Sequence, residues 1–270
     1  MALNLASIST ESQVKAPRIV LLGVEKIGKT SFACGSRVEN GVVAEYGLNK
    51  PVIISVKGEQ GADSIPVAKF PVAQTFGEVI EALGALYAEE HEFGTVVIDS
   101  VSALEPLVWT DTCKEAGVAS IEKVGGGYGK GYTEALTKWR QLLDGLDALR
   151  EKKGMASIII GHTKVKAINN PDTDSYDAYH LDINDKAANL LFRWADLILF
   201  ANTKVVVKKE ETGGFNGEKH RAVDSTNGRR FVYTQKRPSH PGGGRGVFGR
   251  LPYELPLDWA SFQTAIDEIM

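Results

Sequence analysis

Residues 23–30 have the types and spacing of a phosphate-binding loop. They read Gly-Val-Glu-Lys-Ile-Gly-Lys-Thr and match the pattern G-x-x-x-x-G-K-[ST] at every fixed position. The glycines would let the backbone curl so that its N–H groups bind phosphate oxygens. Lys29 would reach the β- and γ-phosphates of a nucleotide, and the Thr30 hydroxyl would hold Mg²⁺. A Gly-rich turn that binds nothing is the alternative.

Two carboxylates could complete this chemistry. Residues 95–99 place Asp99 at the end of an apolar run, where parallel sheets bind ligands, and Asp99 would hold Mg²⁺ through its water shell. The next residue is Ser100, where AAA+ ATPases of the usual kind have a water-activating Glu, so a different acid must serve if ATP is hydrolysed. Glu59 follows the second apolar run and would activate water if its strand lies near the phosphate-loop strand; an exposed loop Glu is the alternative. The expected nucleotide ligands are Gly23, Val24, Glu25, Lys26, Ile27, Gly28, Lys29, Thr30, Ser31 and Asp99, with Thr30 and Asp99 as metal ligands.

The elements that must position these residues alternate along the chain. We expect strands at 18–22, 52–56, 96–98, 156–160 and 196–200, and helices from Lys29 and at 75–90, 133–152 and 186–194. This alternation predicts a mainly parallel sheet with helices on both faces. After Asn202 short antiparallel strands are expected at 205–209, 221–223 and 230–235, with Gly/Asn turns at 213–214 and 227–228 and a helix at 259–270. We therefore expect a loose arm (1–15), a core (16–204) and a β extension (205–270) packed on it as one domain.

The composition is that of a globular protein with an uneven charge distribution. Of 270 residues 43% are hydrophobic, which suffices for a core, and neither a signal peptide nor an apolar run of membrane-spanning length is evident. The two cysteines, Cys34 and Cys113, form no metal-binding spacing, so we expect a reducing compartment. The net charge is −3, but residues 201–250 carry +7. That block either contacts phosphates or is a solvated, charged hairpin.

Several segments, taken in order, resemble one family. They are 23–30, Glu59-Gln60-Gly61, 95–104, 127–132, 158–162 and 228–238, the last followed by Leu-Pro-Leu-Asp-Trp at 255–259. The set resembles the RecA-like P-loop ATPases of bacteriophages that carry an AAA domain, including Sak-type single-strand annealing proteins. One departure is Glu25-Lys26-Ile27, where small residues are expected. The resemblance implies a RecA-like core, a DNA-stimulated ATPase using ATP and Mg²⁺, and a recombination role on single-stranded DNA. It also implies a homo-oligomeric ring or filament, a single-stranded-DNA-binding protein as partner, no membrane, and the cytoplasm of a bacterial host.

The resemblance also suggests roles for residues outside the phosphate loop. A polar residue at the tip of the fourth strand senses the γ-phosphate in RecA-like folds, and His162 has this place; a His bonded to a neighbouring loop is the alternative. Basic residues of a neighbouring subunit stabilise charge on the transferred phosphoryl group, and Lys236 and Arg237 are the first candidates, then Arg245. The expected catalytic residues are Glu59, Lys29, His162, Lys236 and Arg237.

Two further segments are candidates for DNA contact. Residues 163–185 are polar and lack apolar periodicity, so we expect a long loop, whose position matches a DNA-contacting loop of RecA-like proteins. Its second half is acidic, which argues against phosphate binding by the whole segment and leaves Lys164 and Lys166 as the candidates for DNA contact. In the Gly-rich segment 125–132, Lys130 lies between two tyrosines and suits stacking on single-stranded nucleic acid, although packing of both rings is the alternative. The expected DNA-binding residues are Lys130, Tyr128, Tyr132, Lys164, Lys166 and Arg245.

Two other functions are compatible with the phosphate loop. A P-loop kinase for small molecules would need an acceptor pocket and a basic lid, for which 228–250 is a candidate. A non-hydrolysing module would use ATP only to assemble or to regulate a partner.

Overall fold

The computed structural model describes residues 8, 10, 14–172, 174–211, 218–224 and 226–270. Its strands are β1 Arg18–Gly23, β2 Arg37–Glu39, β3 Val42–Glu45, β4 Pro51–Ser55, β5 Ala68–Lys69, β6 Thr95–Asp99, β7 Ala156–Gly161, β8 Thr163–Ile168, β9 Tyr176–Leu181, β10 Leu197–Thr203, β11 Val205–Glu211, β12 Glu218–Asp224, β13 Arg230–Tyr233, β14 Gly243–Gly244 and β15 Glu254–Pro256. Its helices are α1 Lys29–Ala33, α2 Phe76–Ala88, α3 Val101–Glu115, α4 Lys130–Glu134, α5 Leu136–Lys153, α6 Asp185–Trp194 and α7 Trp259–Asp267, with 3₁₀ segments η2 Ile121–Gly126 and η3 Gly246–Arg250.

A nine-stranded sheet organises the described residues. Its order is β15-β13-β10-β1-β7-β6-β4-β5, with β14 paired to β10. The strands from β10 to β5 are parallel, whereas β13, β14 and β15 join antiparallel. The mainly parallel α/β class with an antiparallel C-terminal part is therefore confirmed. β1 lies between β7 and β10, so two strands separate it from β4.

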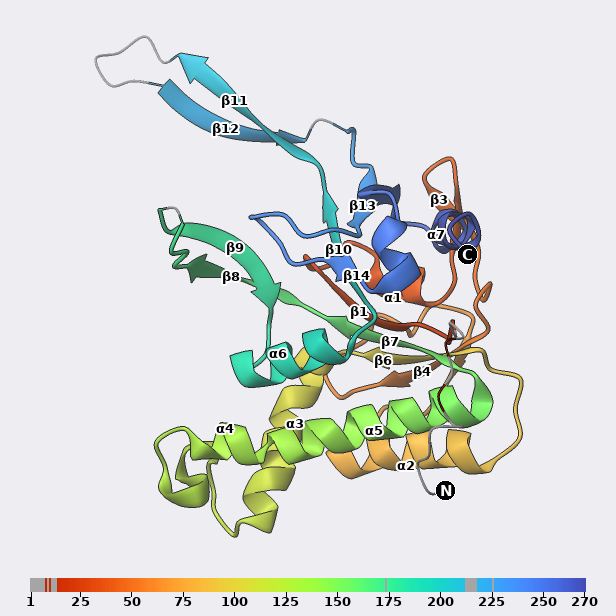
Figure 1. Cartoon of the computed structure of the whole chain (residues 1–270), viewed down its shortest axis with the longest axis vertical. Helices are drawn as coiled ribbons and strands as arrows, with labels where there is room; N and C mark the ends of the chain where they lie inside the picture. Colours follow the sequence, from red (N-terminus) through yellow and green to blue (C-terminus); the bar gives the residue numbers. More distant parts are fainter. Residues whose placement is uncertain (1–7, 9, 11–13, 173, 212–217, 225) are drawn as a thin grey trace.

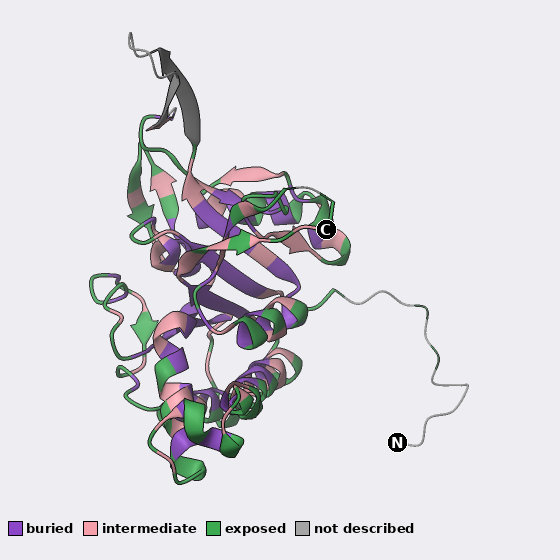
Figure 2. Ribbon diagram, turned by 90° about the vertical axis from the view of Figure 1, so that its left-hand side faces the viewer, coloured by how far each residue is buried: buried purple, intermediate pink, exposed green. Residues whose placement is uncertain are grey.

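The apolar strands pack on both faces because alternate side chains of a strand point to opposite sides. In β1, Val20 and Leu22 join the core formed with α2, α3, α5 and α6. Ile19 and Leu21 join the second core, which includes side chains of α1 and α7. Figure 1 shows the sheet between these two helical layers, and Figure 2 shows the strands buried between them. Continuous apolar runs thus mark strands covered on both sides.

Residues 163–185 correct one expectation, because they are not a loop. They form the β8–β9 hairpin, in which Thr163 pairs with Leu181 and Ile168 with Tyr176. The sequence alternates polar and apolar residues around Asn169-Asn170-Pro171-Asp172, which is a hairpin pattern with a turn. The polar residues of this alternation made the segment look like a polar loop, and the two strands were therefore not predicted.

Three other elements differ from the expectation. The predicted helix at 133–152 is two helices, α4 and α5, which meet at Ala135. Helix α3 was not predicted; it has Pro106 inside it and little segregation of polar and apolar residues. The β2–β3 hairpin was also missed. The β11–β12 hairpin projects from the body, and the predicted turn at 213–214 lies outside the described residues, as does most of the arm at 1–15.

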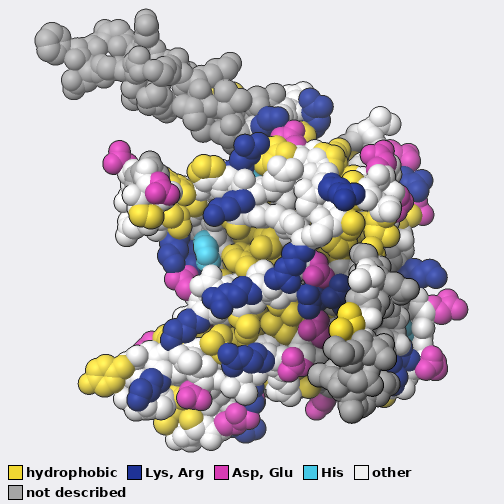
Figure 3. All heavy atoms as spheres, in the orientation of Figure 1, with side chains coloured by type: hydrophobic (Ala, Val, Ile, Leu, Met, Phe, Trp, Pro, Cys, Tyr) yellow, Lys and Arg dark blue, Asp and Glu magenta, His cyan; other side chains and the backbone are white. Residues whose placement is uncertain are grey.

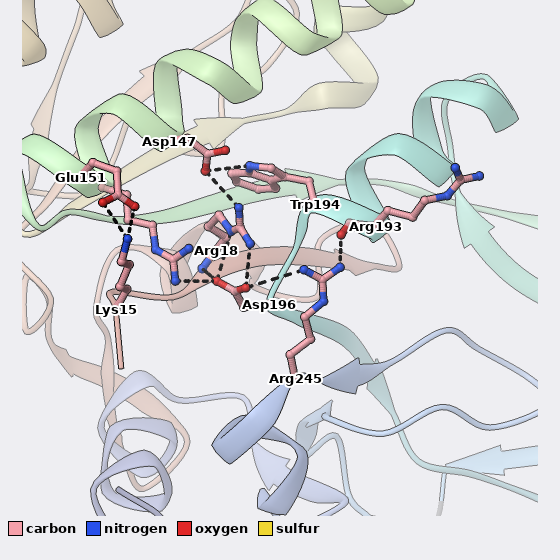
Figure 4. A network of polar contacts seen from close by, with 9 residues as sticks. Lys15, Arg18, Asp147, Glu151, Arg193, Trp194, Asp196 and Arg245 are labelled. Atoms are coloured by element: carbon pink, nitrogen blue, oxygen red, sulfur yellow. Dashed lines mark hydrogen bonds and ion pairs between the residues drawn. The ribbon is translucent and has the colours of Figure 1, made fainter. Parts of the chain in front are cut away.

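A polar network joins the start of β1 to the C-terminal part of the chain (Figure 4). Asp196 accepts hydrogen bonds from Arg18 Nη2 at 2.9 Å and Nε at 3.1 Å, and forms an ion pair with Arg150 at 3.0 Å. Arg245 Nη1 lies 4.0 Å from the same carboxylate, and its Nη2 donates to the Arg193 carbonyl. Arg245 therefore contributes to the cohesion of the fold.

Candidate nucleotide-binding site

The phosphate loop connects β1 to α1 as predicted. At Gly23 a Cβ would lie 2.4 Å from the Ala201 carbonyl oxygen, so the close approach of β1 to β10 requires glycine. Gly28 has φ +110, in the left-handed region that favours glycine. The curled path of the loop thus depends on both glycines, Gly23 for the close approach to β10 and Gly28 for its positive φ.

Lys29 is buried beneath this loop. Its Nζ donates to the carbonyls of Gly23 and Val24 at 2.9 Å each, and the residue is only 6% exposed. Burial lowers the pKa of Lys29, although the charges of Asp99 and Glu59 raise it. The backbone carbonyls hold the Lys29 ammonium at the cavity wall, where it can bind an anion such as a phosphate.

The predicted metal ligands lie together. Thr30 Oγ1 donates to Asp99 Oδ2 at 2.9 Å, at the tip of β6. Burial raises the pKa of Asp99 to about 6, against the hydrogen bond from Thr30. No group of three or more acidic, His or Cys side chains that could cage a metal occurs among the described residues. A hydroxyl and one carboxylate fit Mg²⁺, which is commonly held by one or two protein oxygens together with substrate phosphates.

Glu59 lies in the same site as Thr30 and Asp99, although its strand is not next to the phosphate-loop strand. Its strand, β4, is not adjacent to β1, yet Glu59, in the loop after β4, contacts the residues that follow β6 and β7. Ser100 Oγ donates to Glu59 Oε1 at 2.5 Å, and His162 Nε2 donates to the same oxygen at 2.9 Å. The His162 hydrogen bond lowers the pKa of Glu59 against its partial burial, with further lowering from Ser100. The carboxylate is therefore ionised and oriented at neutral pH.

These side chains face one cavity of about 500 Å³. It is lined by Glu25, Lys26, Ile27, Gly28, Lys29, Thr30, Ser31, Glu59, Gly61, Asp99, Ile160, His162 and Arg230. Six consecutive residues of the phosphate loop, together with Ser31 and all three predicted polar partners, thus meet in a single site.

The other predicted basic residues lie elsewhere in the described chain. Lys236 and Arg237 are exposed outside the cavity lining, and the Arg237 guanidinium stacks 4.1 Å from the centre of the Tyr253 ring. Lys164 Nζ donates to the Ile183 carbonyl at 2.7 Å, and Lys166 pairs with Asp185.

The Gly-rich segment keeps one aromatic side chain free for a ligand. Tyr132 donates to Glu122 and packs edge-on against Trp109 at 5.5 Å. Tyr128 is fully exposed at a residue with φ +55, and Lys130 is exposed at the start of α4.

Sequence reasoning missed three residues of the site. Ser100 was noted only for not being acidic, Gly61 only as part of a matching segment, and Arg230 lies 203 positions after Ile27. A Cβ on Gly61 would lie 2.8 Å from Thr30 Oγ1, which explains the Gly at that position. A Gly two residues after a candidate base was the available signal for Gly61. For Arg230 the only signal was its place in the matching segment 228–238.

A family model described as an AAA domain matches residues 15–246. The chain belongs to this AAA-domain family. The phosphate loop with Asp99 at the tip of β6 is the arrangement of a P-loop nucleotide-binding domain, and P-loop ATPases use a nucleotide and usually Mg²⁺. The chain is also similar to the crystal structure of the RadB recombinase, at 13% identity and a TM-score of 0.40 over 81% of each chain, which is too weak a likeness to support a functional argument. No curated protein matches the sequence. None of the helices in the described part of this AAA-domain protein is long and apolar enough to cross a bilayer.

Proposed function

We propose that the protein hydrolyses ATP with Mg²⁺ and acts on single-stranded DNA in recombination. The observation that carries the ATPase part is the Glu59 carboxylate, held by Ser100 and His162 in the cavity that contains Lys29 and the Thr30–Asp99 pair. A base, a cation and a metal-binding pair are the parts that phosphoryl transfer to water needs.

Each residue has a defined task in this proposal. Lys29 binds the β- and γ-phosphates, while Thr30 and Asp99 hold the metal ion, which when bound neutralises charge on the phosphate oxygens. Glu59 accepts the proton of the attacking water. His162 orients Glu59 through its Nε2–H. The ring lies at the cavity wall, so the same N–H can transfer from Glu59 to the γ-phosphate when ATP binds, which would make it the γ-phosphate sensor.

The test is ATP turnover of the wild type beside Glu59→Gln and Lys29→Ala, each with and without single-stranded DNA. Glu59→Gln removes the base but keeps its shape, so we expect ATP to bind and turnover to fall by about 10²–10⁴-fold. Lys29→Ala should abolish ATP binding. Full turnover in either variant would refute the assignment. ATP bound but intact in the wild type would favour the assembly module, and transfer to a nucleoside or nucleotide would favour the kinase.

The DNA part of the proposal has support from the Gly-rich segment and from α6. Tyr128 and Lys130 are exposed next to each other, and Lys186 and Arg193, seven residues apart, lie on the exposed side of α6. Figure 3 shows Lys and Arg side chains gathered across the face that carries α6 and the α4–α5 end. An exposed ring with cations beside it suits stacking on bases and contact with phosphates.

Single-stranded DNA binding can be measured with Tyr128→Ala and, as control, Tyr132→Phe. Loss of base stacking costs about 1–3 kcal/mol, so we expect roughly 5- to 150-fold weaker binding for Tyr128→Ala. Tyr132→Phe removes only an internal hydrogen bond and should bind normally. Equal affinity of Tyr128→Ala and wild type, or binding that does not weaken with salt, would remove this surface from the proposal.

The oligomer is the remaining part of the proposal, in which Lys236 and Arg237 act on the nucleotide of a neighbouring subunit. It rests on the resemblance, as do the single-stranded-DNA-binding partner protein and the bacterial cytoplasm. Sedimentation with ATP and DNA tests assembly. Mixing Arg237→Ala with Lys29→Ala subunits tests action in trans. In a mixed interface the Arg237→Ala subunit supplies an intact nucleotide site and the Lys29→Ala subunit supplies an intact Arg237, so turnover should recover. No recovery from a mixture that does co-assemble would contradict it.

A further inference from the structure

The C-terminal part of the chain contributes one cation to the nucleotide cavity. Arg230 begins β13, which extends the sheet beyond β10. Its Nη1 donates to the Ile27 carbonyl at 3.2 Å and lies 3.2 Å from where a Cβ of Gly28 would be. Its carbonyl accepts from the Leu257 amide at 3.0 Å. Arg230 is thus held against the phosphate loop of its own chain, with its guanidinium exposed at the cavity wall.

The cavity has two chemically different ends. Asp99, Glu59 and His162 come from β6, the loop after β4 and the tip of β7, all on one side of β1. Arg230 comes from β13, on the other side of β1. Lys29 lies between them, because it follows β1 itself. A polyphosphate with its terminal phosphate at the metal and the base therefore extends its first phosphate toward Arg230.

We propose that Arg230 binds the α-phosphate end of the nucleotide, in cis. This inference rests on the proposed function, because it assigns a further ligand within the same site. The guanidinium has five N–H donors in a planar fork that fits two phosphate oxygens at once. The contact is made to a phosphate that ADP and ATP share. It therefore strengthens the binding of both nucleotides equally and does not act on the transferred phosphoryl group.

Arg229 provides a matched control. It is the preceding residue, has the same side chain and is exposed, but its Nε donates to the Thr226 carbonyl at 3.2 Å, and it is not among the residues that line the cavity. Loss of charge in the C-terminal part is the same in Arg229→Ala and Arg230→Ala. Only the latter removes a group from the nucleotide cavity.

The experiment measures the Kd of MgADP by calorimetry, the Kd of MgATP in a Glu59→Gln background, and kcat in the otherwise native chain. We expect Arg230→Ala to raise both Kd values by the same factor, about 10-fold or more, with kcat within about threefold of the wild type. Arg230→Lys keeps the positive charge but lacks the planar guanidinium, so its Kd values should lie between those of the wild type and Arg230→Ala. Arg229→Ala should change neither constant by more than about twofold.

The outcomes separate this inference from the proposed function. If Arg230→Ala and Arg230→Lys, shown by circular dichroism to be folded, bind MgADP as tightly as the wild type, the inference is overturned and the ATPase proposal stands. A large loss of kcat with unchanged Kd for MgADP also overturns it, because Arg230 would then act on the γ-phosphate. Wild-type protein that binds neither nucleotide overturns the proposed function and this inference together.

Discussion

Replacing Gly61 by alanine tests whether the loop after β4 and the metal-binding pair form one packed unit. A Cβ at Gly61 would lie 2.8 Å from Thr30 Oγ1 and 3.6 Å from Asp99 Oδ2. Ordinary contact begins at 3.4 Å, so the difference between 3.4 and 2.8 Å requires Thr30 or the loop to move by about 0.6 Å. Thr30 is hydrogen-bonded to Asp99, and the loop carries Glu59 two residues earlier. Either movement therefore displaces a group that the reaction needs.

The expected cost follows from this displacement. A misplacement of about 1 Å in a catalytic arrangement can lower the rate by about 100-fold, so we expect kcat of Gly61→Ala to fall by roughly 10- to 100-fold. Binding of MgADP should suffer less, because Lys29 and Arg230 contact other parts of the loop. The unfolding midpoint should change little, since the methyl group meets the tip of a side chain and no backbone atom within 3.4 Å.

The assay compares kcat at saturating MgATP for Gly61→Ala and Gly84→Ala. Gly84 lies within α2, and a Cβ there would meet nothing within 4 Å, so this control adds the same methyl group without a contact. It should keep wild-type kcat and gain stability of up to about 1 kcal/mol from the better helix propensity of alanine. A Gly61→Ala enzyme with kcat within twofold of the control would refute the packing argument.

Three other outcomes are expected. Asp196→Asn leaves the charges of Arg18 and Arg150 without their shared partner, so urea unfolding at pH 7 should show a loss of about 2 kcal/mol, discounted for partial exposure. Although burial opposes it, hydrogen bonds and charge from Arg18 lower the pKa of Asp196, so the stability difference between Asp196→Asn and the wild type should shrink progressively as the pH falls below about 4. A difference that stays constant as the pH falls through this range would contradict the ion-pair explanation. Burial raises the pKa of Glu105 to about 7, so the native state takes up a proton that the unfolded chain does not, and wild-type stability should fall as the pH rises from about 4.5 to 7. Glu105→Gln keeps an oxygen for the Asn184 amide and should lack this decline, so equal pH dependence of the two proteins in thermal unfolding would exclude the assignment.

Much of the fold was predictable because buried parallel strands leave a strong signal. The runs that became β1, β4, β6, β7 and β10 are apolar on both faces, and each was predicted close to its observed position. The strands of β8 and β9 were missed because their hairpin is not covered on both sides, so polar residues such as Lys164 and Lys166 alternate with apolar ones. A continuous apolar run marks a strand covered on both faces, whereas the alternation of a half-covered strand is a weaker signal that is easily taken for a polar loop.

The site residues that could be predicted are those in a local motif or directly after a parallel strand. Residues 23–31 and Asp99 lie at the carboxyl ends of two parallel strands of one sheet, β1 and β6, with β7 between them, so one rule brings them together. That rule also placed Glu59, although two strands separate β4 from β1, since all parallel strands of the sheet end at the same edge. Arg230 comes from an antiparallel strand that joins the sheet late in the chain. Its position depends on pairing between distant segments, which spacing along the sequence does not encode.

The surroundings of Ser100 favour a proposed base that comes from a separate loop. Asp99 is already disfavoured as an anion by burial and, to a smaller extent, by the charge of Glu59. A second carboxylate at position 100, where Ser100 Oγ lies 2.5 Å from Glu59, would add a like charge that neither acid could tolerate while ionised. A neutral hydroxyl at that position instead donates a hydrogen bond and, together with His162, stabilises the ionised form of Glu59. The arrangement is thus electrostatic: the end of β6 supplies the proposed metal ligand and a hydrogen-bond donor, and the proposed base comes from the loop after β4.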